Sequence, residues 1–465
     1  MSVITRPWNR LTLAGKIVLP LLAVLVLLTV LLLAGFASGV IPEIGEFVLL
    51  ILRDNIDIVR FVLAATVILL VTVPTAFVII FMEMKLIAFV NLRIGPNRTG
   101  PWGTLSSVFH GLKVLAKEDY TPTGADVPVF TLAPVVTYLG PVLTLLVIPF
   151  APGLFGFDMN LGLLYFFAVS GLTVLGLMMA GWASFNKYSL LGGLRAAAAI
   201  ISYELPLTLG VVGIIMLAGT MSLNTIVLNQ AGSVLDWYIW QQPLAFLIFF
   251  IAATAEGNRT PFDLTEADSE IVAGFATEYS GMRFGFFFFA EYVNVFILSA
   301  LTTVLFLGGW NAPLDIDPVL QWLNVTVDPT VDPGRLGVGL LFLIALGPPI
   351  AILVLALPLW MLKPDWSFLK ALVVGFLLFN VIVMLAVGIW LAISFEVVIG
   401  LFWFLVKTYT LVAFFVLMRG VLPRVRIDQM MGFAWKWLLP AALLNIFVTA
   451  GAIVLLRDPG VGLGR

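Results

Sequence analysis

The 465-residue sequence contains no cysteine and a single histidine, His110. The chain alone therefore cannot ligate an iron–sulfur cluster or supply two axial histidines to haem, and it forms no disulfide. It also lacks the cysteine and histidine ligands that build most zinc sites. We expect no bound metal, and any redox chemistry in which the chain takes part must use centres held by another subunit.

Charged residues are scarce as well, at 11% of the chain, whereas 61% of the residues are hydrophobic. A soluble domain carries roughly 25% charged and 45–50% apolar residues, so this composition excludes an ordinary soluble protein. The 24 basic and 26 acidic side chains give a formal net charge of −2. No basic excess is present to hold a nucleic acid by its phosphates, and we expect no nucleic-acid partner.

Long apolar runs occupy most of the chain. A run of about 20 apolar residues crosses a hydrocarbon core of about 30 Å, and in lipid it must be helical to satisfy its own backbone groups. The sequence therefore predicts an all-α, polytopic transmembrane helix bundle of about eleven helices. The predicted spans are 17–40, 58–82, 129–150, 161–183, 199–220, 239–257, 284–309, 337–362, 368–393, 396–418 and 435–456.

The positions of the basic residues predict the orientation, because loops rich in Lys and Arg stay in the cytoplasm. With the N-terminus inside, the inside stretches hold 18 of the 24 Lys and Arg. The first span resembles a signal peptide because basic residues precede it, but it is longer than the usual apolar region, and we expect it to be retained.

Seven acidic residues crowd one inside loop and the helices beside it, between Glu256 and Glu291. If the loop is helical, Asp263, Glu266 and Glu270 share one face. Clustering and partial burial raise carboxyl pKa values toward neutrality, where the groups can exchange protons, so the cluster is a candidate proton relay. The alternative is that some of these acids only cap a helix or hydrate the loop.

A further carboxylate, Glu204, falls inside an apolar helix, where an unpaired charge costs a few kcal/mol. We interpret it as functional, the alternative being a structural partner for Arg195. Basic residues also gather near residues 81–101, where a helix leaves the bilayer, which is equally consistent with snorkelling. The next stretch, 105–117, predicts an amphipathic interfacial helix with His110 on its solvated side.

Four stretches, 85–101, 181–206, 255–294 and 423–430, resemble the quinone-chamber membrane subunit of proton-pumping NADH:quinone oxidoreductase, respiratory complex I, in its bacterial form. The resemblance implies a subunit without a redox centre that docks onto a hydrophilic arm, where partner subunits carry FMN and iron–sulfur clusters. Quinone is the implied substrate, the bacterial inner membrane the implied location, and the inside loops help to form the quinone chamber.

The resemblance also implies roles for individual residues, none of them catalytic in the strict sense. The implied proton-relay carboxylates are Glu204, Glu256, Glu266, Asp268, Glu270, Glu278 and Glu291. The expected quinone-chamber residues are Lys85, Arg93, Arg259, Phe262, Asp263 and Arg283. The expected subunit-docking residues are Arg98, Arg195, Arg424, Arg426 and Asp428. The sequence departs from the family pattern at Met84, Asn91, His110, Ala199 and Asp268.

Three of the predicted helices exceed the eight that are usual in this family. We therefore divide the chain into an N-terminal extension (1–57), a quinone-chamber core (58–310), an outside loop with an inserted helix pair (311–394), and the last core helices with the tail (395–465). Two alternatives remain open. One is the equivalent subunit of a ferredoxin- or hydrogenase-linked complex, and the other is a secondary transporter, which would show paired broken helices around a midplane site.

Overall fold

The structure is a computed structural model that describes residues 56–263, 272–313 and 395–456. The chain divides into two units, Met1–Leu63 and Ala64–Arg465. In the first unit only residues 56–63 are described, and they form the start of a helix. The packing, cavities and ion pairs considered below belong to the second unit.

Seven stretches of the described residues are long and apolar enough to cross a membrane. They lie in α4 (Ile56–Val90), α6 (Val127–Thr144), α7 (Gly162–Ala183), α8 (Lys187–Ala218), α13 (Gly281–Phe306), α17 (Phe395–Val421) and the continuous series α18 (Ile427–Phe433), η4 (Ala434–Leu438, a π-helical turn) and α19 (Leu439–Leu456). A shorter apolar helix, α11, spans Pro243–Glu256. No strand occurs among the described residues, and the protein is an all-α, multi-pass membrane helix bundle.

Short helical elements connect these spans. They are η1 (Pro101–Gly103), α5 (Ser106–Leu115), α9 (Leu223–Leu228), η2 (Val234–Asp236), α10 (Tyr238–Gln241) and η3 (Gly274–Ala276). Helix α5 confirms the amphipathic helix predicted from spacing. Its apolar side chains Phe109, Leu112 and Leu115 are about half-exposed, as expected of a helix that lies in the membrane interface.

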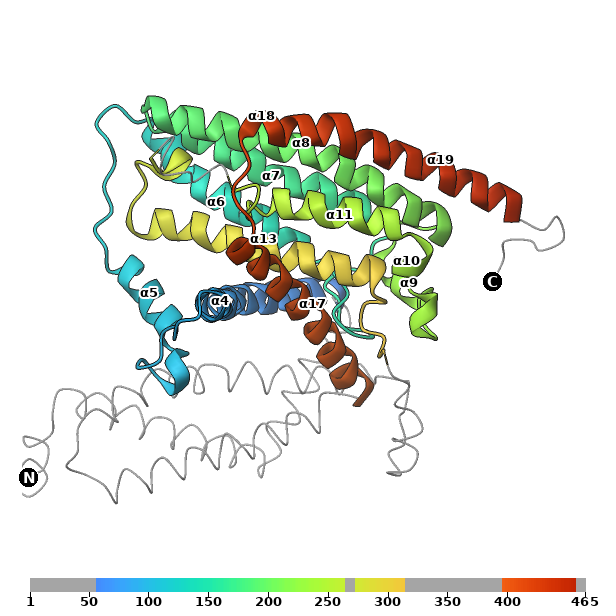
Figure 1. The fold of residues 1–465 in the computed structure, drawn as a ribbon. Coiled ribbons are helices and arrows are strands. Elements are labelled where there is room, and N and C mark those ends of the chain that lie inside the picture. The colour runs from blue at the N-terminus through green and yellow to red at the C-terminus, as the bar shows by residue number, and fades with distance from the viewer. Residues whose placement is uncertain (1–55, 264–271, 314–394, 457–465) are drawn as a thin grey trace, which may run out of the picture. The chain divides into compact units, whose positions relative to one another are not determined.

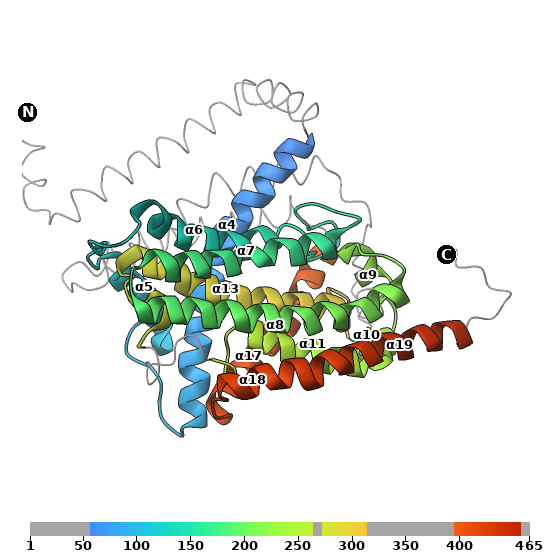
Figure 2. The same ribbon diagram turned by 90° about the horizontal axis from the view of Figure 1, so that it is seen from above.

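Helices α6, α7 and α8 lie side by side, and α11 and α19 pack on α8 (Figures 1 and 2). Helix α4 runs across their direction and is seen end-on in Figure 1. Helix α13 contacts α6, α11 and α17 and is the most buried span, with 67% of its apolar window buried against 22–50% in the others. It therefore forms the centre of the described bundle.

Eight of the eleven predicted spans fall on described residues and are helical there, although their boundaries move. The stretch 184–198, which lies between two predicted spans, is helical from Lys187 onward, where the Asn186 side chain accepts a hydrogen bond from the Tyr188 N–H. Its glycines are packing positions: a Cβ on Gly192 would lie 2.5 Å from Gly274 Cα. The spans predicted at 17–40, 337–362 and 368–393 lie outside the described residues.

Candidate functional site

Two carboxylates and two guanidinium groups meet where α4, α13 and α17 approach the loop after α11. The Arg259 side chain, 3% exposed, places one nitrogen 3.3 Å from Glu83 Oε2 and the other 3.7 Å from Glu291 Oε1. The second Glu83 oxygen accepts a hydrogen bond from Arg419. The Arg259 guanidinium also lies 4.4 Å from the centre of the Tyr292 ring, a favourable cation–π arrangement. The four charges balance, so the group can stay ionised although it is largely buried.

The charge balance has an electrostatic consequence for Arg259. Burial acts to lower its pKa, but the carboxylates of Glu291 and Glu83 outweigh burial and hold the pKa of Arg259 above the ordinary arginine value. Arg259 therefore remains a cation. Removing a partner from such a buried pair costs about 3–5 kcal/mol, because the remaining charge has lost its water without a replacement.

The loop after α11 holds Arg259 in place through backbone hydrogen bonds. The Arg259 N–H donates to Thr254 O at 3.1 Å, and the preceding residue, Asn258, adopts a left-handed conformation with φ of 50°. The Pro261 carbonyl accepts a hydrogen bond from the Val425 N–H at 3.0 Å, which ties this loop to the segment between α17 and α18. The predicted chamber residues on this loop are therefore held by contacts with a segment far along the chain.

Two further predicted chamber residues follow on the same loop. Asp263, 6% exposed, accepts a hydrogen bond from Arg424 at 2.9 Å. The Phe262 ring packs 5.3 Å from the ring of Tyr203 in α8. Arg424, one of the expected subunit-docking residues, thus contacts the loop after α11 through Asp263.

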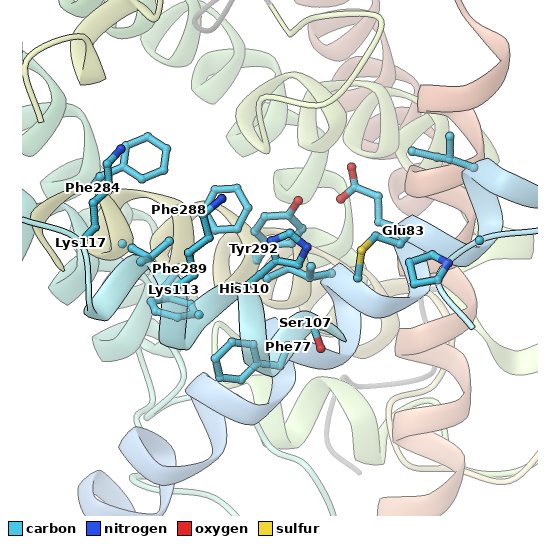
Figure 3. Close-up of a pocket in the computed structure, with 18 of the residues that line it drawn as sticks. Phe77, Glu83, Ser107, His110, Lys113, Lys117, Phe284, Phe288, Phe289 and Tyr292 are labelled. Atoms are coloured by element: carbon cyan, nitrogen blue, oxygen red, sulfur yellow. The ribbon is translucent and has the colours of Figure 1, made fainter. Parts of the chain in front are cut away.

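A cavity of about 620 Å³ lies between α4, α5 and α13 (Figure 3). Its labelled side chains extend from Lys117 and Phe284 at one end to Glu83 at the other. Most of the wall is aromatic or aliphatic, and the aromatic lining residues are Phe77, Phe284, Phe288, Phe289 and Tyr292. The ionisable lining residues are Glu83, Arg93, His110, Lys113 and Lys117. A mostly apolar cavity of this size with a few polar groups suits a small amphipathic molecule.

A second, much smaller cavity of about 30 Å³ is lined by residues of α6, α7, α11 and α13, among others. Glu256 and Glu291 line it. Glu256 is 6% exposed, and its Oε2 has no hydrogen-bond donor among the described residues. Glu204 lies near enough to Glu256 for their charges to interact. The structure thus brings together three predicted relay carboxylates, two of them on one cavity.

The remaining predicted residues do not join the ion-pair cluster. Glu278 accepts a hydrogen bond from Asn186 at 2.6 Å, Arg283 pairs with Asp119 at 3.2 Å, and Lys85 lies over the Phe81 ring. The Arg98, Arg426 and Asp428 side chains are exposed, and Arg195 is partly exposed. Glu266, Asp268 and Glu270 lie outside the described residues.

Sequence reasoning missed two members of the ion-pair cluster, Glu83 and Arg419. In the sequence both are charges at membrane exits, where snorkelling and topology explain them equally well. The His110 side chain is exposed, as expected, and it also borders the larger cavity. Only the packing of α4 and α17 against the loop after α11 distinguishes Glu83 and Arg419 from ordinary charges at a membrane interface. Among the described residues, no group of three or more metal-ligating side chains comes together.

The comparisons with known proteins all point to the same family. A family model described as NADH dehydrogenase matches residues 62–450. An NADH-quinone oxidoreductase subunit of Anoxybacillus flavithermus is 43% identical over 373 residues, covering 80% of this chain and 87% of the relative. The same-named proteins of Dehalococcoides mccartyi and Brevibacillus brevis are 39% and 40% identical, covering 83% and 84% of this chain and 85% and 92% of theirs. The chain therefore belongs to the NADH dehydrogenase family of membrane subunits.

Proposed function

We propose that this chain is a membrane subunit of an NADH-quinone oxidoreductase, where it helps to form the quinone site and couples quinone reduction to proton translocation. One observation carries the proposal: Arg259 contacts a carboxylate from each cavity, Glu83 on the larger and Glu291 on the smaller. The relatives named above support the assignment to this enzyme.

The larger cavity suits a quinone. Its aromatic wall can hold the apolar ring and tail, while Glu83, His110 and Tyr292 offer polar contacts to the carbonyl oxygens. The chain brings no cysteine to ligate an iron–sulfur cluster, so the electrons must come from clusters in partner subunits, fed through FMN. What this chain supplies is the shape and electrostatics of the chamber.

The ion-pair cluster provides a physical route from quinone charge to proton movement. Two-electron reduction of a quinone creates negative charge that must be neutralised, and in a low-dielectric site that charge acts strongly on Arg259. When the guanidinium is drawn toward the larger cavity, Glu291 loses part of its cationic partner and its affinity for a proton rises. Glu256 and Glu204 then continue the path of carboxylates away from the cluster.

The inside face would dock onto the hydrophilic arm. Exposed Arg98, Arg426 and Asp428 provide charged contacts for partner subunits. We place the complex in the bacterial inner membrane with the N-terminus of this chain in the cytoplasm, as the distribution of basic residues predicts.

Substitution of Arg259 in the assembled complex tests the proposal. Arg259→Ala is expected to lower quinone turnover at least tenfold, because it leaves Glu83 and Glu291 without their shared cation. Arg259→Lys should retain more activity, since it keeps the charge. NADH-driven quinone reduction and NADH oxidation with an artificial acceptor are measured side by side, the second reporting electron input alone.

Lys187→Ala serves as the matched control, because Lys187 is an exposed base at the inside end of α8 and lines neither cavity. Unaltered quinone affinity and rate in Arg259→Ala, with normal assembly, would contradict the proposed role of the cluster.

A further inference from the structure

One buried lysine of α17 belongs neither to the ion-pair cluster nor to the lining of the two cavities. Lys407 is 9% exposed, and among the described residues it forms no salt bridge. It lines neither cavity. A cation inside an apolar span is costly unless other groups replace its water. The fold must therefore provide Lys407 with partners other than a carboxylate.

Three backbone carbonyls surround the Lys407 ammonium. Its Nζ donates to Leu307 O at 2.7 Å, Gly309 O at 3.1 Å and Asn311 O at 2.6 Å. An ammonium has three N–H donors, whereas a neutral amine has only two. Contacts with three acceptors therefore require the charged form. The ring of Trp237, with its centre 4.2 Å from Nζ, adds a cation–π contact.

These carbonyls belong to the turn that follows α13. Gly308 and Gly309 adopt left-handed conformations, with φ of 71° and 53°, and turn the chain sharply after the helix. The carbonyl groups at a helix C-terminus lack intrahelical donors and carry partial negative charge. Lys407 supplies donors to this turn from a different helix. It therefore joins α17 to the end of α13 by charge-assisted hydrogen bonds.

The other basic residue of α17 lies in the ion-pair cluster, where Arg419 donates to Glu83. The helix contains no proline, and it packs on α13. At a rise of about 1.5 Å per residue, Lys407 and Arg419 lie about 18 Å apart along its axis. Because an unbroken helix transmits a displacement along its length, the position of one basic group constrains the position of the other.

Helix α13 is also held at both ends. Glu291 contacts Arg259 in the cluster, and the turn at the opposite end of the helix binds Lys407. Charged contacts thus fix α13 and α17 to each other at the turn and to the same cluster at their other ends. A shift of α17 along α13 would disturb both sets of contacts.

We propose that Lys407 is a positioning residue for the ion-pair cluster: it fixes α17 along α13 and thereby holds Arg419 at Glu83. This inference rests on the function proposed above, in which Glu83 offers a polar contact to quinone. When Arg419 is displaced, Glu83 retains only Arg259 as a partner and is no longer fixed on the cavity wall. Lys407 thus affects quinone binding without lining the cavity.

A double-mutant cycle in the intact complex tests this coupling. Lys407→Met removes the charge and all three donors, and Arg419→Gln removes the cation at Glu83. Each variant should raise the apparent KM for quinone about threefold, while NADH oxidation with an artificial acceptor stays at the parent rate. The combined variant should have the KM of Arg419→Gln alone, because Lys407 acts through Arg419. Residues this far apart otherwise act independently, and the two changes in KM would multiply.

Two further variants separate positioning from a general loss of packing. Lys407→Arg keeps the charge and the donors, so it should return the KM most of the way to the parent value. Lys436→Met makes the same change as Lys407→Met at an exposed lysine that lines neither cavity, and it should leave the KM unchanged. Should Lys407→Met fail to assemble, Lys407→Gln, which keeps amide donors, takes its place in the cycle.

A parental KM in Lys407→Met, or a KM in the combined variant equal to the product of the two single effects, would overturn the positioning role and leave the cluster's role at the quinone site standing. A parental KM in Arg419→Gln would instead contradict the function proposed for the cluster, and the inference would fall with it.

Discussion

Glu83 holds two guanidinium groups at once, and this single carboxylate joins α4 to the loop after α11 and to α17. In the sequence it has no special status, because an acid near a membrane exit needs no partner. Burial changes that interpretation: a residue that is 7% exposed and contacts Arg259 and Arg419 is part of the internal structure.

Glu83→Gln should therefore destabilise the subunit by about 3 kcal/mol, at the lower end of what breaking a buried pair costs, because Arg259 retains Glu291. The melting temperature of the purified complex measures the loss. Glu118→Gln, at an exposed carboxylate, should leave the melting temperature unchanged. Equal melting temperatures for the two variants would show that the pair contributes nothing to stability.

The proposed relay carboxylates illustrate how far residue chemistry alone can be predicted. Glu204 and Glu256 stand out in the sequence because an acid in an apolar helix is expensive. Their proximity to each other, and the cavity that Glu256 shares with Glu291, depend on how α8, α11 and α13 pack. Residue type indicated a role for these carboxylates, whereas their arrangement in space came only from the fold.

At the scale of elements, glycines determine how closely the helices approach. Gly192 of α8 faces Gly274 of η3, and Gly176 and Gly140 admit the threonines of the opposite helix. Gly192 and Gly193 both lie inside α8, although glycine is a poor helix former in water. In a membrane bundle the same residue promotes close packing of backbones, which explains its place inside this helix.

Gly192→Ala is expected to destabilise the fold by about 1–3 kcal/mol, since the added methyl meets the backbone of Gly274, which has little freedom to move. The yield and melting temperature of the assembled complex report the effect. Gly171→Ala is the matched control in α7, where an added Cβ has no neighbour within 4 Å. A Gly192→Ala complex as stable as this control would refute the packing argument.

At the scale of the whole molecule, the absence of cysteine becomes an experimental advantage. A single introduced cysteine is the only thiol of this chain, so it reports the side of the membrane on which its position lies. Thr123, in the loop between α5 and α6, and Ala231, in the connection after α9, are both exposed and fall on opposite sides of the predicted topology.

Thr123→Cys should react with a membrane-impermeant maleimide only in inverted vesicles, and Ala231→Cys only in intact spheroplasts, because basic loops remain inside. Mass spectrometry of the labelled chain measures the modification, with the parent chain as the unlabelled blank. Labelling of both positions from the same side would rule out the predicted topology.

The sequence by itself determined the class of protein. Composition required a membrane helix bundle without redox ligands, since apolar length and missing ligand types are properties of the chain that no packing can alter. It also singled out Glu256 and Arg259, because charge near apolar helices is costly wherever it lies.

Only the tertiary structure decided which charges meet. The pairing of Glu83 with Arg259 and the linings of the two cavities join residues that lie far apart in the sequence. Periodicity assigns a residue to a face of its own helix, but it carries no information about which other helix covers that face. The contacts that we propose to link quinone chemistry to proton movement are of this second kind.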